Sequence, residues 1–146
     1  MYLDTCIMVK LLAPEPDTAW FDRELRGHSL VTSELAVVEI ESALLSKERA
    51  KAITREQRLR AEAKFAEMIE SETLRLLTLN LRVLRRAARI LDLCHPRVPL
   101  RSLDALHLAQ SDLEQEFPIC TTDSRMHAAA RELRLPVFPE HLPLAL

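Results

Sequence analysis

The sequence predicts an α/β fold in which a mainly parallel sheet carries helices on both faces. Short apolar runs typical of strands alternate along the chain with longer segments whose apolar residues recur at helical spacing. Such alternation implies right-handed crossover connections between parallel strands. The length of 146 residues is typical of one domain, and the sequence contains no repeat or linker, so we expect a single domain over residues 1–146.

Five short segments are predicted to form the strands. They are apolar or rich in β-branched residues, and turn-forming or helical sequence bounds each of them. In chain order, the expected strands cover residues 1–4, 28–33, 73–79, 117–122 and 135–138.

The helices are predicted from the segments between these strands, which cover residues 5–12, 17–26, 34–47, 54–70, 80–93, 103–113 and 124–134. Two prolines in "APEPD" at 13–17 end the first helix, and Gly27 ends the second. Thr54 and Gln57 have the spacing of a capping box, which opens the long fourth helix. Ser102 is the expected cap of the sixth helix, and the terminal "PEHLPLAL" has no assignment.

Composition and charge disfavour several classes of protein. Aromatic residues make up only 4% of the chain, which argues against a base-stacking RNA-binding platform. The net charge of −2 gives no overall attraction for nucleic acid, so an RNA partner would need a local basic face. No apolar run reaches the ~18 residues of a membrane span, and Asp4 and Lys10 interrupt the stretch where a signal peptide would lie. We therefore expect a cytoplasmic protein that does not bind membranes.

The content of glycine and cysteine removes further options. Gly27 is the single glycine, whereas Walker A loops, GxGxxG turns and GxSxG elbows each need two or more. The three cysteines, Cys6, Cys94 and Cys120, form no CxxC pair and no zinc-binding spacing. We interpret them as small buried hydrophobic residues.

Three aspartates are expected at the carboxyl edge of the sheet, where open α/β sheets bind ligands. Asp4 ends the first strand, Asp123 follows the fourth strand, and Asp104 lies in the first turn of a helix. Taken alone, Asp104 and Asp123 are most simply helix caps. Asp4 follows a core strand in a chain without phosphate-binding glycines, which favours a functional role.

A fourth acid is expected in the helix at 34–47, which contains Glu34, Glu39 and Glu41. Apolar residues flank all three glutamates at spacings of three or four, so helical periodicity does not choose among them. The physical reasoning leaves this choice open.

A cluster of three or four carboxylates predicts a divalent cation. Two carboxylates ~4 Å apart repel by roughly 4 kcal/mol at an effective dielectric constant of about 20. Oxygen ligands without His or Cys suit Mg²⁺ or Mn²⁺ rather than zinc. Such an ion lowers the pKa of a bound water and polarises a phosphoryl oxygen, which is the chemistry of phosphodiester cleavage.

Four pieces of sequence also occur in a familiar order: "YLDT" at 2–5, "TSELAVVEIESAL" at 32–44, "SLDALHLAQ" at 102–110 and "CTTD" at 120–123. Together they resemble the PIN domain, and within it the VapC-like toxins of type II toxin–antitoxin pairs. This resemblance implies a three-layer α/β/α sandwich around a mainly parallel sheet of about five strands. It also implies a ribonuclease that uses Mg²⁺ or Mn²⁺.

The resemblance also implies the site residues. It carries the metal-binding and catalytic acids of the family onto Asp4, Glu39, Asp104 and Asp123. It places Thr5 and Thr121 as supporting residues of the pocket. His107 matches the "DALHLA" pattern of the family and is interpreted as structural. Cys6 is a departure, because Ser or another small residue is expected there.

The implied partners are an RNA substrate and a cognate antitoxin, with a homodimer or a toxin–antitoxin hetero-oligomer as the expected assembly. The alternative is a non-catalytic PIN-like scaffold or RNA-binding module in which the acids are remnants. A phosphatase of the haloacid-dehalogenase type is disfavoured, because it needs a second acid two positions after Asp4, where Cys6 stands.

Overall fold

The structure is a computed structural model that describes residues 1–142. Its five strands form one sheet in the order β3-β2-β1-β4-β5, and every neighbouring pair is parallel. The strands are β1 (Tyr2–Leu3), β2 (Leu30–Ser33), β3 (Leu74–Leu77), β4 (Ile119–Cys120) and β5 (Val137–Phe138). The predicted parallel α/β sheet is therefore confirmed.

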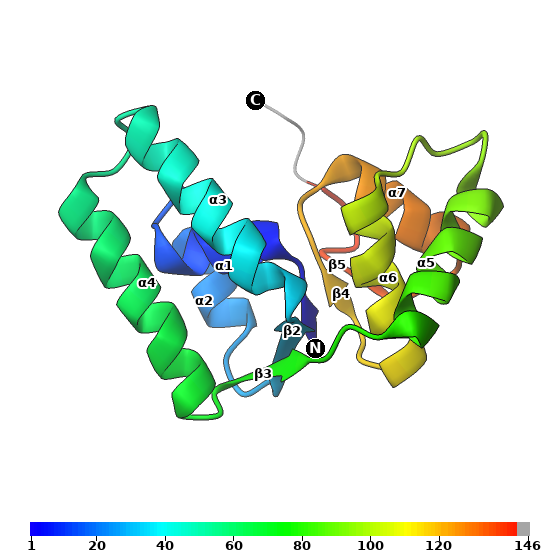
Figure 1. The fold of residues 1–146 in the computed structure, drawn as a ribbon, viewed down its shortest axis with the longest axis horizontal. Coiled ribbons are helices and arrows are strands. Elements are labelled where there is room, and N and C mark those ends of the chain that lie inside the picture. Colours follow the sequence, from blue (N-terminus) through cyan, green and yellow to red (C-terminus); the bar gives the residue numbers. More distant parts are fainter. Residues whose placement is uncertain (143–146) are drawn as a thin grey trace.

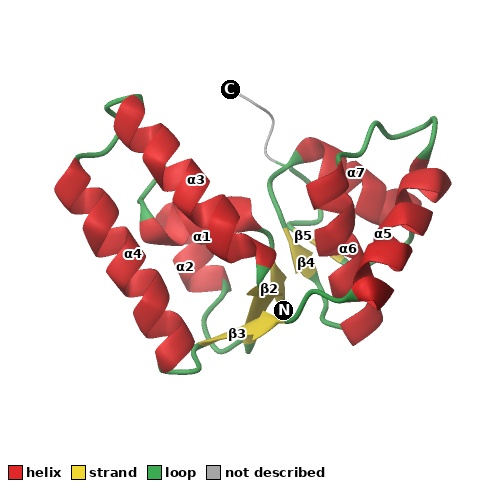
Figure 2. Cartoon of the chain, in the orientation of Figure 1, coloured by secondary structure: helices red, strands yellow, loops and turns green. Residues whose placement is uncertain are grey.

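Seven helices cover the two faces of this sheet. They are α1 (Thr5–Leu12), α2 (Thr18–Glu24), α3 (Leu35–Arg49), α4 (Arg55–Glu70), α5 (Leu81–Cys94), α6 (Ser102–Glu114) and α7 (Ser124–Glu132). Helices α1 to α4 lie on one side of the strands and α5 to α7 on the other (Figures 1 and 2). The expected three-layer α/β/α sandwich is thus confirmed.

The strands are short, and alternate residues enter two separate cores. Tyr2 packs into the core beneath α5, α6 and α7, whereas its neighbour Leu3 packs into the core beneath α1 to α4. Ile119 and Cys120 divide between the two cores in the same way. This alternation follows from the two-residue period of a strand and explains why the strands read as continuous apolar runs.

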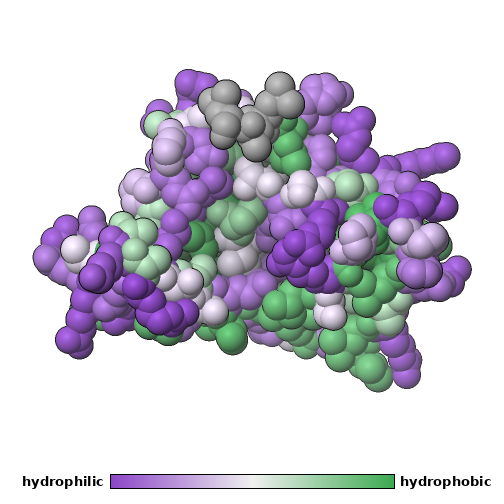
Figure 3. Space-filling model, turned by 90° about the horizontal axis from the view of Figure 1, so that it is seen from above, coloured by the Kyte–Doolittle hydropathy of each residue, from purple (hydrophilic) through white to green (hydrophobic). Residues whose placement is uncertain are grey.

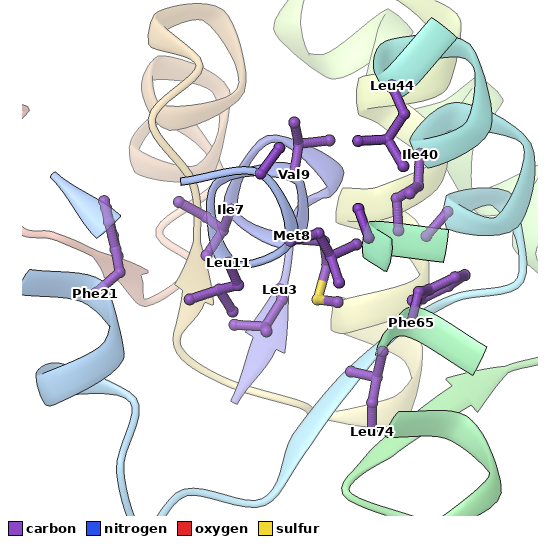
Figure 4. Close-up of a cluster of buried hydrophobic side chains, with 14 of the residues drawn as sticks. Leu3, Ile7, Met8, Val9, Leu11, Phe21, Ile40, Leu44, Phe65 and Leu74 are labelled. Carbon is purple, nitrogen blue, oxygen red and sulfur yellow. The ribbon is translucent and has the colours of Figure 1, made fainter. Parts of the chain in front are cut away.

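The core beneath α1 to α4 is built around the fully buried side chains of Leu3 and Met8 (Figure 4). Ile40 and Leu44 reach it from α3, and Phe65 reaches it from α4. The spacing of four residues between Ile40 and Leu44 places both on one face of α3. The opposite face of this helix is left free for the solvent and the neighbouring pocket.

The boundaries of several elements differ from the sequence-based expectation. The second helix ends at Glu24, and the chain then turns through Gly27, whose φ of +81° lies in the left-handed region that favours glycine. The expected strand at 117–122 shortens to β4, because Thr121 and the residues after it turn toward α7 and Thr121 Oγ1 accepts a hydrogen bond from Asp123 N.

The predicted cap at Ser102 is wrong. Arg101 occupies the N-cap position of α6, and Ser102 is already the first helical residue. Asp104 Oδ2 accepts a hydrogen bond from the Arg101 backbone N–H at 3.2 Å, so the third helical residue bonds back to the N-cap residue.

Two further expectations concern the whole chain. The predicted single domain includes residues 143–146, which lie outside the described residues. Within residues 1–142, none of the helices combines the length and the apolar character that crossing a membrane requires.

Candidate active site

An open pocket lies at the carboxyl edge of the sheet, between α3 and the first turns of α6 and α7. Asp4 comes directly after β1, and Asp123 comes three residues after the end of β4. The lining of the pocket includes all four acids of interest, Asp4, Glu39, Asp104 and Asp123. Four acids that are far apart in the sequence therefore face one space.

Two side chains donate hydrogen bonds to the carboxylate of Asp4. Its Oδ2 accepts a hydrogen bond of 2.6 Å from the Thr121 hydroxyl and one of 3.0 Å from the Cys6 thiol. Asp4 stands at the N-cap position of α1, yet its side chain makes no capping hydrogen bond. A capping role therefore does not account for this buried carboxylate.

Thr121 links two of the acids. Its hydroxyl donates to Asp4 Oδ2 and accepts from the backbone N–H of Asp123 at 3.0 Å. This supporting residue thus fixes the Asp4 carboxylate relative to the start of α7.

Glu39 projects from the middle of α3 and meets residues of two other helices. Its Oε2 accepts hydrogen bonds from the Thr5 hydroxyl at 2.6 Å and from His107 Nε2 at 2.7 Å. Burial raises the pKa of the Glu39 carboxyl, but the bonds and charge of His107 and the bond from Thr5 outweigh burial and leave this pKa lowered. Glu39 is therefore held in its ionised form.

Asp104 and Asp123 each stabilise the start of a helix. Asp104 Oδ2 accepts from the Arg101 N–H, as described above. Asp123 Oδ1 accepts from the backbone N–H groups of Arg125 at 2.8 Å and Met126 at 3.0 Å. Asp123 is therefore the N-cap of α7, whereas Asp104 bonds back to Arg101, the N-cap residue of α6, and each aspartate uses one carboxylate oxygen.

The four acids share one feature: each engages the protein through a single oxygen. Within residues 1–142, the other oxygen has no hydrogen-bond partner from the protein. These four free atoms are Asp4 Oδ1, Glu39 Oε1, Asp104 Oδ1 and Asp123 Oδ2. The pocket therefore offers one uncommitted carboxylate oxygen from each acid.

The negative charges in the pocket act on one another. Burial raises the pKa of the Asp104 carboxyl, and the charges of Asp123 and Asp4 raise it further, against the lowering effect of the Arg101 N–H. Burial, the charge of Asp4 and the hydrogen bond to Asp4 raise the pKa of the Cys6 thiol to about 12. A bound cation would relieve this mutual repulsion.

The donor set fits a hard divalent cation, since it consists of carboxylate oxygens from four side chains around one pocket. In the described part of the chain, however, no three His, Cys, Asp or Glu side chains are already close enough together to hold one ion. Binding would therefore require the free oxygens to move toward a common point while the bonded oxygens stay anchored.

A comparison with protein-family models identifies the family of this chain. The family model of the PIN domain matches residues 1–132. The chain belongs to the PIN domain family. No curated protein sequence matches the chain significantly.

Solved structures agree with this PIN fold. A chain from a toxin–antitoxin complex of Klebsiella pneumoniae is similar to it with a TM-score of 0.65 and 13% sequence identity, covering 97% of this chain and 98% of that one. FitAcB from Neisseria gonorrhoeae is similar with a TM-score of 0.67 and 19% identity, covering 97% and 99% respectively. At such low identities the likeness shows the fold alone.

Of the three glutamates that periodicity left open, only Glu39 lines the pocket of this PIN domain. Glu34 stands at the N-cap of α3, and its Oε2 accepts from the Leu79 N–H at 3.1 Å. Glu41 is exposed on α3. The choice depends on the rotation of α3 over the sheet, which no local pattern in the sequence contains.

Cys6 and His107 contact the acids of the site, although the sequence predicts structural roles for both. Cys94 and Cys120 are buried, as expected, but Cys6 is only partly buried and lines the pocket, where its thiol contacts Asp4. His107 is 1% exposed, as a structural residue would be, yet its ring bonds directly to Glu39. The only signal in the sequence for either contact is proximity to Asp4 and Asp104.

Proposed function

We propose that this PIN domain is a divalent-metal-dependent endoribonuclease that acts as the toxin of a toxin–antitoxin pair. The observation that carries the proposal is the pocket in which Asp4, Glu39, Asp104 and Asp123 each present one uncommitted oxygen. Membership of the PIN family and the structural likeness to a chain from a toxin–antitoxin complex support it.

In this proposal the four acids hold Mg²⁺ or Mn²⁺ through their free oxygens. The ion, when bound, supplies a Lewis acid and an activated water for attack on the phosphodiester. Thr121 and Thr5 fix the carboxylates of Asp4 and Glu39, because each hydroxyl donates a hydrogen bond to one oxygen and leaves the other oxygen free. Asp104 is held by its bond to the Arg101 N–H, and Asp123 by the start of α7 that it caps.

The direct test is RNA cleavage by the purified chain with Mg²⁺ or Mn²⁺, with EDTA, and after Asp4→Asn. Asn keeps an oxygen that can accept from Thr121 but removes the charge, so we expect a folded protein without activity. Glu41→Gln is the matched control, because Glu41 is an exposed residue of α3, the helix that carries Glu39. We expect this variant to retain cleavage. Cleavage that persists in EDTA or in Asp4→Asn contradicts the proposal.

We further propose that the protein acts in the cytoplasm and binds an antitoxin peptide that places a basic side chain in the acidic pocket. Two exposed apolar residues at the mouth, Val38 (69% exposed) and Leu103 (44% exposed), provide a surface for such a peptide or for a second copy of the chain. Growth arrest by the chain alone, relieved by co-expression of the product of the neighbouring gene, tests this. Equal growth of cells expressing the wild type and Asp4→Asn contradicts it.

A second candidate is an RNA-binding PIN module without catalysis. The observation that favours it is the spacing of the acids, which in the described residues do not already converge on one point. Binding of RNA that is unaffected by Mn²⁺, without cleavage, distinguishes this module from the nuclease.

A further inference from the structure

We infer that His107 is a positioning residue that orients Glu39 toward the metal pocket. This inference rests on the proposed metal-dependent function and extends it to a residue outside the four acids. It starts from a chain of hydrogen bonds that runs from the core of the protein to the pocket through Tyr2, His107 and Glu39.

The first link joins His107 to Glu39. Because an ionised carboxylate only accepts hydrogen bonds, His107 Nε2 is the donor in the 2.7 Å contact with Glu39 Oε2. The Thr5 hydroxyl donates to the same oxygen at 2.6 Å. With two donors on Oε2, the carboxylate presents Oε1 as its free atom.

The second link fixes the imidazole itself. His107 Nδ1 and the Tyr2 hydroxyl share a hydrogen bond of 2.7 Å, and the two rings meet edge to face with centroids 5.8 Å apart. Tyr2 is fully buried in β1, and His107 is 1% exposed in α6. The imidazole is therefore held by both nitrogens, and its orientation is set by the core.

Glu39 needs such support because its side chain is long and only partly buried. Its side chain is 21% exposed, and fixing a glutamate in one rotamer costs conformational entropy. A donor that is already immobile reduces the number of orientations that Glu39 samples before an ion binds. Partners of this kind commonly change metal affinity or activity by about 10–100-fold when they are removed.

A purely structural histidine gives a different expectation. In that case His107 serves only to satisfy the buried Tyr2 hydroxyl, and its loss lowers stability without changing the affinity of the folded protein for metal. The two roles can be separated by substitutions of His107 that keep a polar group at the place of only one of the two ring nitrogens.

The test is the affinity for Mn²⁺, measured by calorimetry without RNA, of His107→Gln and His107→Asn in the full chain. The Gln amide reaches the place of Nε2 and can donate to Glu39, whereas the Asn amide reaches only the place of Nδ1 and can bond to Tyr2. We expect Gln to retain most of the affinity and Asn to lose about tenfold or more. His107→Leu removes both bonds and should bind as weakly as Asn if it folds.

His127→Leu is the matched control. His127 is also buried, but its ring bonds to the Pro139 carbonyl and it does not line the pocket. Its replacement should leave Mn²⁺ affinity unchanged, and circular dichroism should show that each variant is folded at the temperature of the titration.

The outcomes separate the two proposals. If the wild type binds Mn²⁺ and folded His107→Asn binds it equally well, the positioning role is wrong and the metal-dependent function stands. If the wild type binds no Mn²⁺, the proposed function fails, and the positioning role fails with it.

Discussion

Asp104 and Asp123 each use one carboxylate oxygen at a helix start, and in the proposed nuclease the other oxygen holds the ion. One oxygen of Asp123 caps α7, and the other faces the pocket without a protein partner in the described chain. The capping bonds of Asp123 therefore leave one oxygen available for the proposed ion. Stability and metal binding should respond to different substitutions.

Replacement of Asp123 by Asn or Ala separates these two purposes. Asn is as good an N-cap as Asp, so Asp123→Asn should retain the free energy of unfolding, whereas Asp123→Ala should lose about 1 kcal/mol. Both substitutions remove a carboxylate and should weaken Mn²⁺ binding. Urea denaturation and calorimetric titration check the two effects, and equal stability of the two variants would argue against the capping role.

The N-termini of α4 and α6 are stabilised by different side chains. The start of α4 has a complete capping box, in which the Gln57 N–H donates to the Thr54 hydroxyl at 3.1 Å and the Thr54 N–H donates to the Gln57 side chain at 2.7 Å. The start of α6 instead uses the Asp104 carboxylate, and Ser102 contributes no capping bond. A hydroxyl residue near a helix start therefore contributes to the free energy of unfolding at Thr54 but not at Ser102.

A comparison of Thr54→Ala with Ser102→Ala measures this difference. Loss of the capping hydroxyl should lower the free energy of unfolding by about 1 kcal/mol in Thr54→Ala. Ser102→Ala should have almost no effect, because alanine is favourable within a helix. Chemical denaturation of both variants provides the measurement, and a larger loss in Ser102→Ala would reverse the assignment of the caps.

At the scale of the whole molecule, ion pairs through Glu15 join α1 to α3. Glu15, in the loop after α1, bonds to Lys10 of α1 at 2.7 Å and to Lys47 of α3 at 2.6 Å. Burial raises the pKa of the Glu15 carboxyl, but the bonds and charges of the two lysines outweigh burial and leave this pKa lowered. The folded state therefore binds the proton less readily than the unfolded state.

Glu15→Gln should consequently lower stability by up to about 1 kcal/mol at neutral pH, the upper range for partly exposed ion pairs. Because the pKa is lowered on folding, this contribution is complete above the ordinary Glu value of 4.5 and is lost as the pH falls through the folded value. The difference between the wild type and Glu15→Gln should thus shrink in acid. Glu70→Gln, on an exposed residue, is the control, and a difference that grows in acid would contradict the assignment.

The pocket lined by the four acids lies between the two helical layers of the molecule. Seen from above, the molecule carries hydrophilic residues over both flanks, with paler and apolar residues between them (Figure 3). The polar flanks belong to the two helical layers, and the carboxyl edge of the sheet lies between these layers (Figure 1).

The sequence by itself determined the class of the fold and the identity of most of its elements. Alternation of apolar runs with helical patterns is a local signal, and Thr54 with Gln57 marks the start of α4 without reference to any distant residue. The positions of Asp4, Asp104 and Asp123 at strand ends and helix starts follow from the same local patterns.

Helical periodicity left open which glutamate faces the pocket, and the family resemblance indicated Glu39. Only the tertiary structure decided which partners hold it there. Glu34 stands at the N-cap of α3, and Glu39 and Glu41 lie on this helix with similar neighbours. The rotation of this helix is set by the packing of Ile40 and Leu44 in the core. The bond between His107 and Glu39 joins residues 68 positions apart. Contacts between distant residues depend on how the layers pack, which is why the sequence places the acids at one edge but does not reveal the hydrogen bonds that hold them.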